Sequence, residues 1–180
     1  SLAAGQGLAL GLAALFQPER GIFKFFRAAV YLPSIVPIVA SAAVWMWLFN
    51  PDLGLVNHTL GLMGIKGPGW LLDARWAKIA LVIIGLWGVG PAMLIYLAAL
   101  KEVPKQYYEA ALIDGASRWQ QFVYVTLPSI RHVIAFNSIM GLIAALQFFA
   151  PVYVMTNGTG QPQDSTMVYT LYLFRNAFIN

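Results

Sequence analysis

Three long segments of this sequence contain no charged residue: 28–49, 79–100 and 133–155. They are 22, 22 and 23 residues long, and a helix needs about 20 apolar residues to cross the hydrocarbon core of a bilayer. Only 10% of all residues are charged, whereas a soluble domain carries about 25%. Because lipid offers no hydrogen-bond partners, the backbone of such segments has to form helices. The sequence therefore predicts an all-α, polytopic membrane helix bundle in a single domain over residues 1–180.

The apolar segment 2–16 is also uncharged, but its 15 residues are short of a full crossing. No initiator methionine and no charged leader region precede it, so it is interpreted as part of a span and not as a signal peptide. Gly7 and Gly11 form a GxxxG spacing, which can seat a partner helix. The alternative is the ordinary use of glycine in membrane helices.

The residue inventory argues against several kinds of chemistry. The three complete spans contain no Asp, Glu, His, Lys or Arg, which argues against proton-coupled transport and catalysis inside the membrane. There is no cysteine, and His58 has no second ligand at metal spacing, so we expect no metal and no cofactor. The nucleotide-binding pattern GxxxxGK[ST] is absent, and Gly88-Val-Gly90 lacks the third glycine of a dinucleotide fingerprint. We therefore expect a protein that is not an enzyme and does not hydrolyse ATP itself.

The polar segment 101–132, between two spans, has the pattern of a pair of helices. Pro104 can begin a helix, because its missing N–H would have no partner in a first turn. Asp114 and Gly115 form a turn signal, and Ser117 can cap a second helix. In that second helix, five residues follow the spacing of one helical face, namely Trp119, Phe122, Val123, Thr126 and Leu127. Pro128 then marks a change of direction.

The same segment resembles the EAA loop of permease subunits in bacterial ABC importers. The resemblance rests on three short motifs, Glu109-Ala110-Ala111, Asp114-Gly115-Ala116 and Thr126-Leu127-Pro128. Neighbouring residues resemble the carbohydrate branch of that family, the maltose and glycerol-3-phosphate type: Tyr108, Ser117, Trp119, Gln120 and Phe122. Phe25-Phe26-Arg27 and residues 50–54 look more like the larger, maltose-type first subunit. The resemblance implies the type I ABC importer permease fold, truncated at both ends, where the family has further helices.

This resemblance implies a transmembrane subunit of an ATP-driven, binding-protein-dependent importer for a sugar or related polyol in the bacterial inner membrane. The implied partners are a cytoplasmic dimer of ATP-binding subunits, a second permease subunit, an extracytoplasmic solute-binding protein and the lipid bilayer. Coupling to the ATPase is implied for Tyr108, Glu109, Ala110, Ala111, Asp114, Gly115 and Ala116. Two alternatives stay open: an ABC permease for another small solute, and a non-transporting membrane scaffold.

The basic residues predict the orientation of the chain. Seven of the 11 Lys and Arg residues lie in 17–27 and 101–132, on one side of the membrane. The other four lie on the opposite side: Lys66, Arg75, Lys78 and Arg175. Because loops rich in Lys and Arg stay in the cytoplasm, residues 101–132 are predicted to be cytoplasmic, where the family places its EAA loop. The net charge of +4 is interpreted as this topology bias, and no nucleic-acid partner is expected.

Two spans carry irregular or polar residues near the middle of the membrane. Glycines and Pro91 interrupt 79–100, and 133–155 contains Asn137 and Gln147. Irregular backbone is tolerated at this depth where protein packs against it or where it lines a cavity, and an amide there needs a partner. A packing kink and an interhelical hydrogen bond are the alternatives to contact with a solute. The predicted translocation path comprises Trp87, Gly88, Pro91, Gln147 and Phe148.

Overall fold

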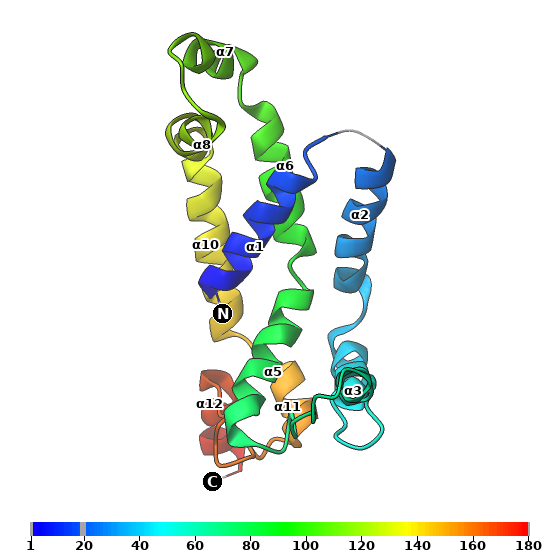
Figure 1. Cartoon of the computed structure of the whole chain (residues 1–180). Helices are drawn as coiled ribbons and strands as arrows, with labels where there is room; N and C mark the ends of the chain where they lie inside the picture. Colours follow the sequence, from blue (N-terminus) through cyan, green and yellow to red (C-terminus); the bar gives the residue numbers. More distant parts are fainter. Residues whose placement is uncertain (1, 19–20, 180) are drawn as a thin grey trace. The chain divides into compact units, whose positions relative to one another are not determined.

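The computed structural model describes residues 2–18 and 21–179, and all regular secondary structure in those residues is helical (Figure 1). This confirms the predicted all-α fold class. Besides the α-helices there is one 3-10 helix, η1, and one π-helix, η2. The elements in chain order are α1 (Leu2–Leu15), α2 (Gly21–Tyr31), η1 (Leu32–Ile35), α3 (Ile38–Leu48), α4 (Leu55–Leu62), α5 (Ala74–Trp87), α6 (Gly90–Glu102), α7 (Lys105–Ile113), α8 (Arg118–Gln121), η2 (Phe122–Thr126), α9 (Leu127–Ser129), α10 (Arg131–Leu146), α11 (Ala150–Thr156) and α12 (Tyr169–Phe178).

The chain folds into two compact units, and each unit combines two separate stretches of sequence. The first unit contains the residues up to Ser34 together with Gly88–Leu142. The second contains Ile35–Trp87 together with the residues from Ile143 onward. Each unit has its own cluster of buried apolar side chains.

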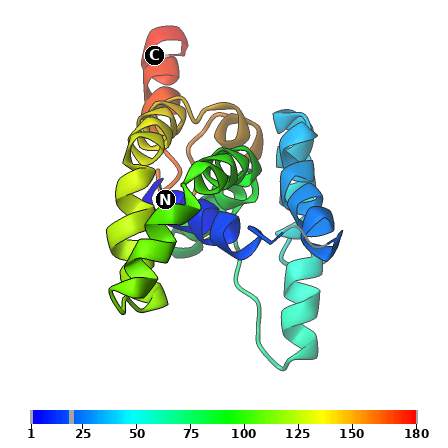
Figure 2. The ribbon, with the colours of Figure 1, turned by 90° about the horizontal axis from the view of Figure 1, so that it is seen from above.

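In the first unit, α1 packs obliquely against α6 (Figure 1 and Figure 2). Ala9 and Ala13 of α1 and Met93 of α6 are fully buried at this contact. Small side chains let two helix backbones approach closely, so the alanines serve the role that Gly7 and Gly11 were predicted to serve. The two glycines instead stay exposed, and a Cβ added at either would meet no other part of the chain within 4 Å beyond its own helix.

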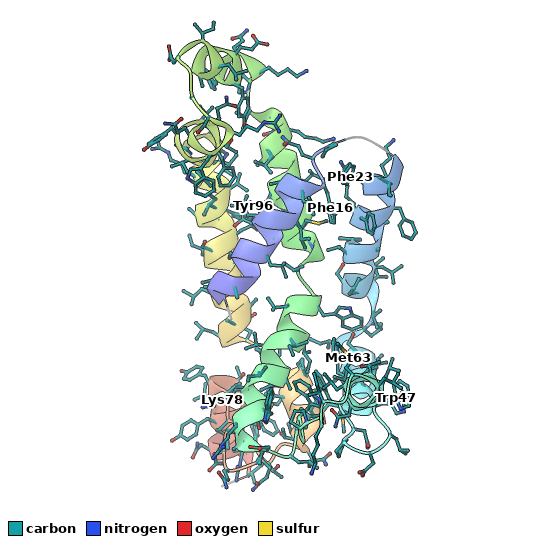
Figure 3. All side chains as sticks on the ribbon, viewed as in Figure 1. Phe16, Phe23, Trp47, Met63, Lys78 and Tyr96 are labelled. Carbon is teal, nitrogen blue, oxygen red and sulfur yellow. The ribbon has the colours of Figure 1, made fainter. Side chains whose placement is uncertain are left out.

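The end of α1 is fixed by side chains from α2. The ring of Phe16 packs against that of Phe23, with 6.3 Å between centroids (Figure 3). The Arg27 side chain donates hydrogen bonds to the backbone carbonyls of Phe16 and Pro18, the latter at 2.9 Å. These carbonyls follow the last turn of α1 and have no helical partner, so a basic side chain satisfies them and complements the helix dipole.

A polar contact joins three helices inside the first unit. The Tyr96 hydroxyl of α6 donates to Gln6 Oε1 of α1 at 2.6 Å, and Gln6 Nε2 donates to the backbone carbonyl of Asn137 in α10 at 2.9 Å. In an apolar environment such bonds hold helices in register, because the alternative is an unsatisfied polar group. The bond from Gln6 to Asn137 is thus made to the backbone carbonyl of Asn137.

The second unit contains a continuous series of aromatic contacts. Rings are 5.0–5.4 Å apart, centroid to centroid, along the sequence Trp76, Trp70, Phe49, Trp45 and Trp87. These contacts connect the long loop after α3 to the last residue of α5. The loop after α3 is therefore anchored to the helices and is not free surface chain.

The helix boundaries differ from those predicted for the spans. Residues 28–49 do not form one helix, because α2 already begins at Gly21 and the chain breaks between Ile35 and Ile38. Pro33 and Pro37 cause this break, since proline has no N–H to donate to the preceding turn. Helix α2 therefore includes residues on both sides of position 28, where the predicted span begins.

One helix in the described residues is long and apolar enough to cross a membrane by itself, Arg131–Thr156 with 26 residues. It includes α10 and α11 and the short interruption at 147–149. Two pairs reach the same length and composition only when each interrupted pair counts as one span: Gly21–Ile35 with Ile38–Leu48, and Ala74–Trp87 with Gly90–Glu102. The second interruption falls at Gly88-Val89, within predicted span 79–100. Which side of a membrane each loop occupies stays a prediction.

Candidate coupling site

The polar segment forms a short helix, a glycine turn and a second helical stretch at one end of the first unit (Figure 1). Helix α7 ends with a Schellman motif around Gly115, whose φ is +76°. The N–H of Ala116 donates to the carbonyl of Ala111 at 2.9 Å, and the N–H of Gly115 donates to that of Leu112 at 3.0 Å. This pairing satisfies carbonyls at the helix end, and its left-handed position favours glycine.

A capping box begins the second helical stretch at Ser117, the residue predicted to cap it. The Ser117 hydroxyl accepts from the N–H of Gln120, and the Gln120 side chain accepts from the N–H of Ser117 at 2.8 Å. This reciprocal pairing satisfies two donors that an uncapped helix would leave free. The turn between the two helices is therefore set by local hydrogen bonds on both sides of Gly115.

The second stretch is not one regular amphipathic helix as predicted. Helix α8 is a single turn, and it continues as the π-helix η2 up to Thr126. A π turn holds more residues than an α turn and so shifts the faces of the helix. The side chain of Trp119, predicted on the packed face, is 71% exposed. Thr126 is buried, and the other three predicted residues are half-buried.

Three sets of side chains lie on α7. Tyr108 points inward, where its ring packs against the buried cluster of the first unit. Glu109, Leu112 and Ile113 are exposed, and Ile113, at 87%, is the most exposed large apolar side chain in the described residues. The third set consists of Tyr107, Ala110 and Ala111, which lie on the side of α7 toward η2, α9 and the start of α10.

A hollow of about 700 Å³ lies between α7 and that second stretch. Its lining consists of Tyr107, Ala110, Ala111, Asp114, Tyr124, Val125, Pro128, Ser129, Arg131 and His132. The small side chains of Ala110 and Ala111 leave this space open, and a carboxylate and basic groups both border it. The hollow can receive a protruding side chain of another protein.

The structure thus brings the seven predicted coupling residues together on α7 and its turn, but it gives them different surroundings. Glu109 is exposed, three residues line the hollow, Gly115 and Ala116 form the turn, and Tyr108 is turned inward. These seven residues do not include the exposed Leu112 and Ile113 or the hollow-lining Tyr107 and Tyr124. The spacing of Tyr107, Ala110, Ala111 and Asp114 at i, i+3, i+4 and i+7 is the signal that would have indicated a shared helix face.

The predicted path residues lie at two helix interruptions. Trp87 ends α5, Gly88 lies in the gap and Pro91 is in the first turn of α6. Gln147 and Phe148 lie between α10 and α11. Gly88 and Pro91 belong to the first unit, whereas the other three residues belong to the second. Gly88, Pro91 and Gln147 are exposed, and the Trp87 ring contacts that of Trp45 edge to face.

Comparison with solved structures finds a transporter with the same arrangement. A chain of the bacterial alginate ABC transporter, solved in complex with an alginate pentasaccharide-bound periplasmic protein, matches with a TM-score of 0.85 and 28% sequence identity. The match covers 97% of this chain and 62% of that chain.

Several relatives are named as sugar permeases. The chain is 39% identical to the lactose transport system permease protein LacF of Rhizobium radiobacter, over 95% of this chain and 58% of the relative. It is 40% identical to the trehalose/maltose transport system permease protein MalF of Thermococcus litoralis, over 82% of this chain and 50% of the relative. The chain thus spans somewhat more than half the length of its relatives.

The family model described as "Binding-protein-dependent transport system inner membrane component" matches residues 7–178. This match includes both units and the whole of the polar segment that suggested an importer permease from its motifs. The expected resemblance is confirmed. The chain belongs to the family of inner membrane components of binding-protein-dependent transport systems.

Proposed function

We propose that this chain forms part of the transmembrane subunit of an ATP-driven, binding-protein-dependent importer for a sugar or related polyol. The observation that carries the proposal is α7, a short helix with an exposed acidic and apolar surface, held by defined turns between two apolar helices. Relatives are named for the transport of lactose, trehalose/maltose and diacetylchitobiose, which supports a carbohydrate as the solute. The family description, an inner membrane component, supports the bacterial inner membrane as the location.

Helix α7 is the proposed docking element for a cytoplasmic ATPase. Glu109 presents a carboxylate to a basic side chain of the ATPase, while the exposed Leu112 and Ile113 supply apolar surface. The hollow beside them accepts a side chain from the same partner. Apolar area gives most of the binding energy of such an interface, and complementary charge sets the orientation.

The energy for transport comes from that partner, because the sequence contains no GxxxxGK[ST] motif. The proposed assembly contains a dimer of ATP-binding subunits, this chain, a second permease subunit and an external solute-binding protein. The periplasmic protein in the alginate transporter complex supports the last of these partners.

Solute is proposed to pass along the two helix interruptions. Trp87 and Phe148 offer aromatic faces, and Gln147 offers an amide, which together suit a neutral and hydroxyl-rich solute. Gly88 and Pro91 keep the backbone irregular at the first interruption, as is tolerated where it lines a cavity. Calorimetry on the cognate binding protein with lactose, maltose, trehalose and diacetylchitobiose identifies the solute class.

The docking proposal is tested by reversing one charge. Glu109→Lys is expected to reduce co-purification of the ATPase, because a partly buried ion pair lost at an interface costs on the order of 2–5 kcal/mol. Glu102→Lys is the matched control, since it reverses an exposed charge at the end of α6, outside α7. Equal ATPase recovery and equal import by both variants would argue against α7 as the docking element. Failure of the parent chain to bind any ATPase would favour the scaffold alternative.

A further inference from the structure

The side chain of Tyr108 connects α7 to the second helical stretch through a single polar contact. Its hydroxyl lies 2.9 Å from Thr126 Oγ1. Thr126 is only 5% exposed, so this contact is shielded from water. The adjacent Tyr107 is 55% exposed and lines the hollow instead. The two neighbouring tyrosines therefore have different surroundings, although they have the same chemistry.

Thr126 is the last residue of the π-helix, and its hydroxyl has a second contact there. Thr126 Oγ1 lies 3.4 Å from the carbonyl of Gln121, to which it donates. With the threonine proton directed to that carbonyl, the Tyr108 hydroxyl is the donor in the shorter contact. The hydroxyl of Thr126, at the end of η2, therefore contacts both Tyr108 of α7 and the carbonyl of Gln121, the residue just before η2.

The π-helix has a local cause. Pro128 lacks an N–H, so the carbonyl of Tyr124 has no α-helical donor four residues later. The chain adjusts with an i to i−5 bond from the N–H of Leu127 to the carbonyl of Phe122. Single π turns inside α-helices occur frequently at functional sites. In this chain the π turn lies between the proposed docking helix and the start of α10.

A second contact holds the start of the second helical stretch just after the glycine turn. Gln121 Nε2 donates to the carbonyl of Ala116 at 3.0 Å. It joins the last residue of α8, which leads directly into η2, to the residue that follows Gly115. Beyond η2, the chain enters α10 after only α9 and Ile130.

We infer that Tyr108 is a positioning residue that makes α7 and η2 move together, so that displacement of α7 by an ATPase reaches α10. This inference rests on the proposed function, because it requires that α7 docks to an ATPase. The tyrosine acts through Thr126 and does not contact the ATPase. In α7, Glu109, Leu112 and Ile113 thus form the docking surface, whereas Tyr108 transmits the motion.

The competing explanation is that Tyr108 only fills the buried cluster. Phenylalanine retains the ring and removes the hydroxyl, so Tyr108→Phe separates packing from the polar link. Thr126→Val removes the same contact from the other side, and Thr126→Ser keeps the hydroxyl. Tyr169→Phe is the matched control, because it makes the same chemical change on an exposed side chain of α12, outside the coupling segment.

The test uses the complete transporter with cysteine-free partner subunits in nanodiscs. This chain contains no cysteine, so Met140→Cys places a single thiol on α10, at a side chain that is 48% exposed. The measured quantity is the maleimide labelling rate with ATP and vanadate divided by the rate without nucleotide. The recovery of the ATPase after purification is measured in the same samples.

Tyr108→Phe and Thr126→Val are each expected to reduce the nucleotide-dependent change in labelling by about 2- to 10-fold, the range for one hydrogen bond. Neither is expected to change ATPase recovery. The double variant should be no worse than either single variant, and Thr126→Ser and Tyr169→Phe should behave like the parent chain.

The inference is overturned if Tyr108→Phe keeps the full labelling response, while Glu109→Lys still loses the ATPase; the docking proposal then stands alone. A parallel loss of ATPase recovery and response in Tyr108→Phe would also overturn it, because the hydroxyl would then be needed for docking itself and not only for transmission. Ala135→Cys provides a second labelling site on α10. If nucleotide changes the labelling rate at neither Met140→Cys nor Ala135→Cys in the otherwise unchanged chain, the proposed function itself fails.

Discussion

The N–H of Ala116 donates to the carbonyl of Ala111 across the turn at Gly115, at 2.9 Å. This bond is possible because Gly115 adopts a φ of +76°. A Cβ at Gly115 would have no heavy atom within 4 Å, so only the backbone conformation restricts the residue there.

Gly115→Val is therefore expected to distort the turn without filling any space. A left-handed conformation costs an L-residue roughly 1–2 kcal/mol, and more for a β-branched one. Import and solute-stimulated ATP hydrolysis in proteoliposomes should be lost, whereas solute binding to the external protein should not change. Gly115→Asn is the control, because asparagine tolerates this conformation. Normal import by the valine variant would show that the turn geometry is dispensable.

The exposed apolar side chain of Ile113 is expected to contribute directly to ATPase docking. Complete burial of such a side chain contributes about 1.5–3 kcal/mol. Ile113→Ser should therefore reduce ATPase recovery about 10-fold without lowering the thermal stability of the purified chain. Leu53→Ser is the control, since Leu53 is 79% exposed but belongs to the second unit. The prediction fails if both serine variants recover the same amount of ATPase.

Asn57 is expected to be essential for the order of the loop after α3. Its Oδ1 accepts from the Trp70 indole at 2.7 Å, and its Nδ2 donates to the carbonyls of Pro51 and Pro68, each at 3.1 Å. Asn57→Leu leaves these groups without partners and should cost about 1–3 kcal/mol of stability. Thermal unfolding followed by tryptophan fluorescence measures the loss. Thr59→Val, which removes one local bond to Val56, should change little.

The orientation of the chain is testable with single cysteines. A thiol at Ser117 should be labelled only from the cytoplasm, because the excess of basic residues predicts that side for residues 101–132. The external position is better tested at Lys66 than at Gly67, since a Cβ at Gly67 would lie 2.1 Å from Asn57 Oδ1. Membrane-impermeant maleimide applied to whole cells and to inverted vesicles gives the answer. Reversed labelling of the two sites would overturn the topology.

Gln147→Leu is expected to change which solutes are imported while leaving assembly intact. Gln147 is exposed at the interruption between α10 and α11, so its amide is available to a passing solute. Uptake of labelled lactose, maltose and trehalose is compared with that of the parent transporter. Ser138→Ala, a polar change inside α10, serves as the comparison. Identical uptake of every transported sugar would remove Gln147 from the path.

Local chemistry in the sequence was enough to predict the turn and the cap of the coupling segment. Gly115 follows Asp114 in a turn pattern, and Ser117 precedes Gln120 at capping-box spacing, so both features depend on residues only a few positions apart. The predicted regular helix after Ser117 was wrong in its second half. Pro128 was recognised as a change of direction, but its effect on the preceding turn, a π-helix, was not foreseen.

The sequence by itself determined the helical class and the family, because uncharged apolar segments and short motifs are local properties of the chain. Only the tertiary structure decided that Tyr108 points to Thr126 while Tyr107 lines the hollow. It also decided that Ala9 and Ala13, and not Gly7 and Gly11, pack against α6. A helical pattern gives the spacing of side chains, but the neighbour on each face is chosen by segments distant in sequence. Packing between those segments therefore decides which side chains point inward and which point outward, a distinction that the sequence pattern alone does not make.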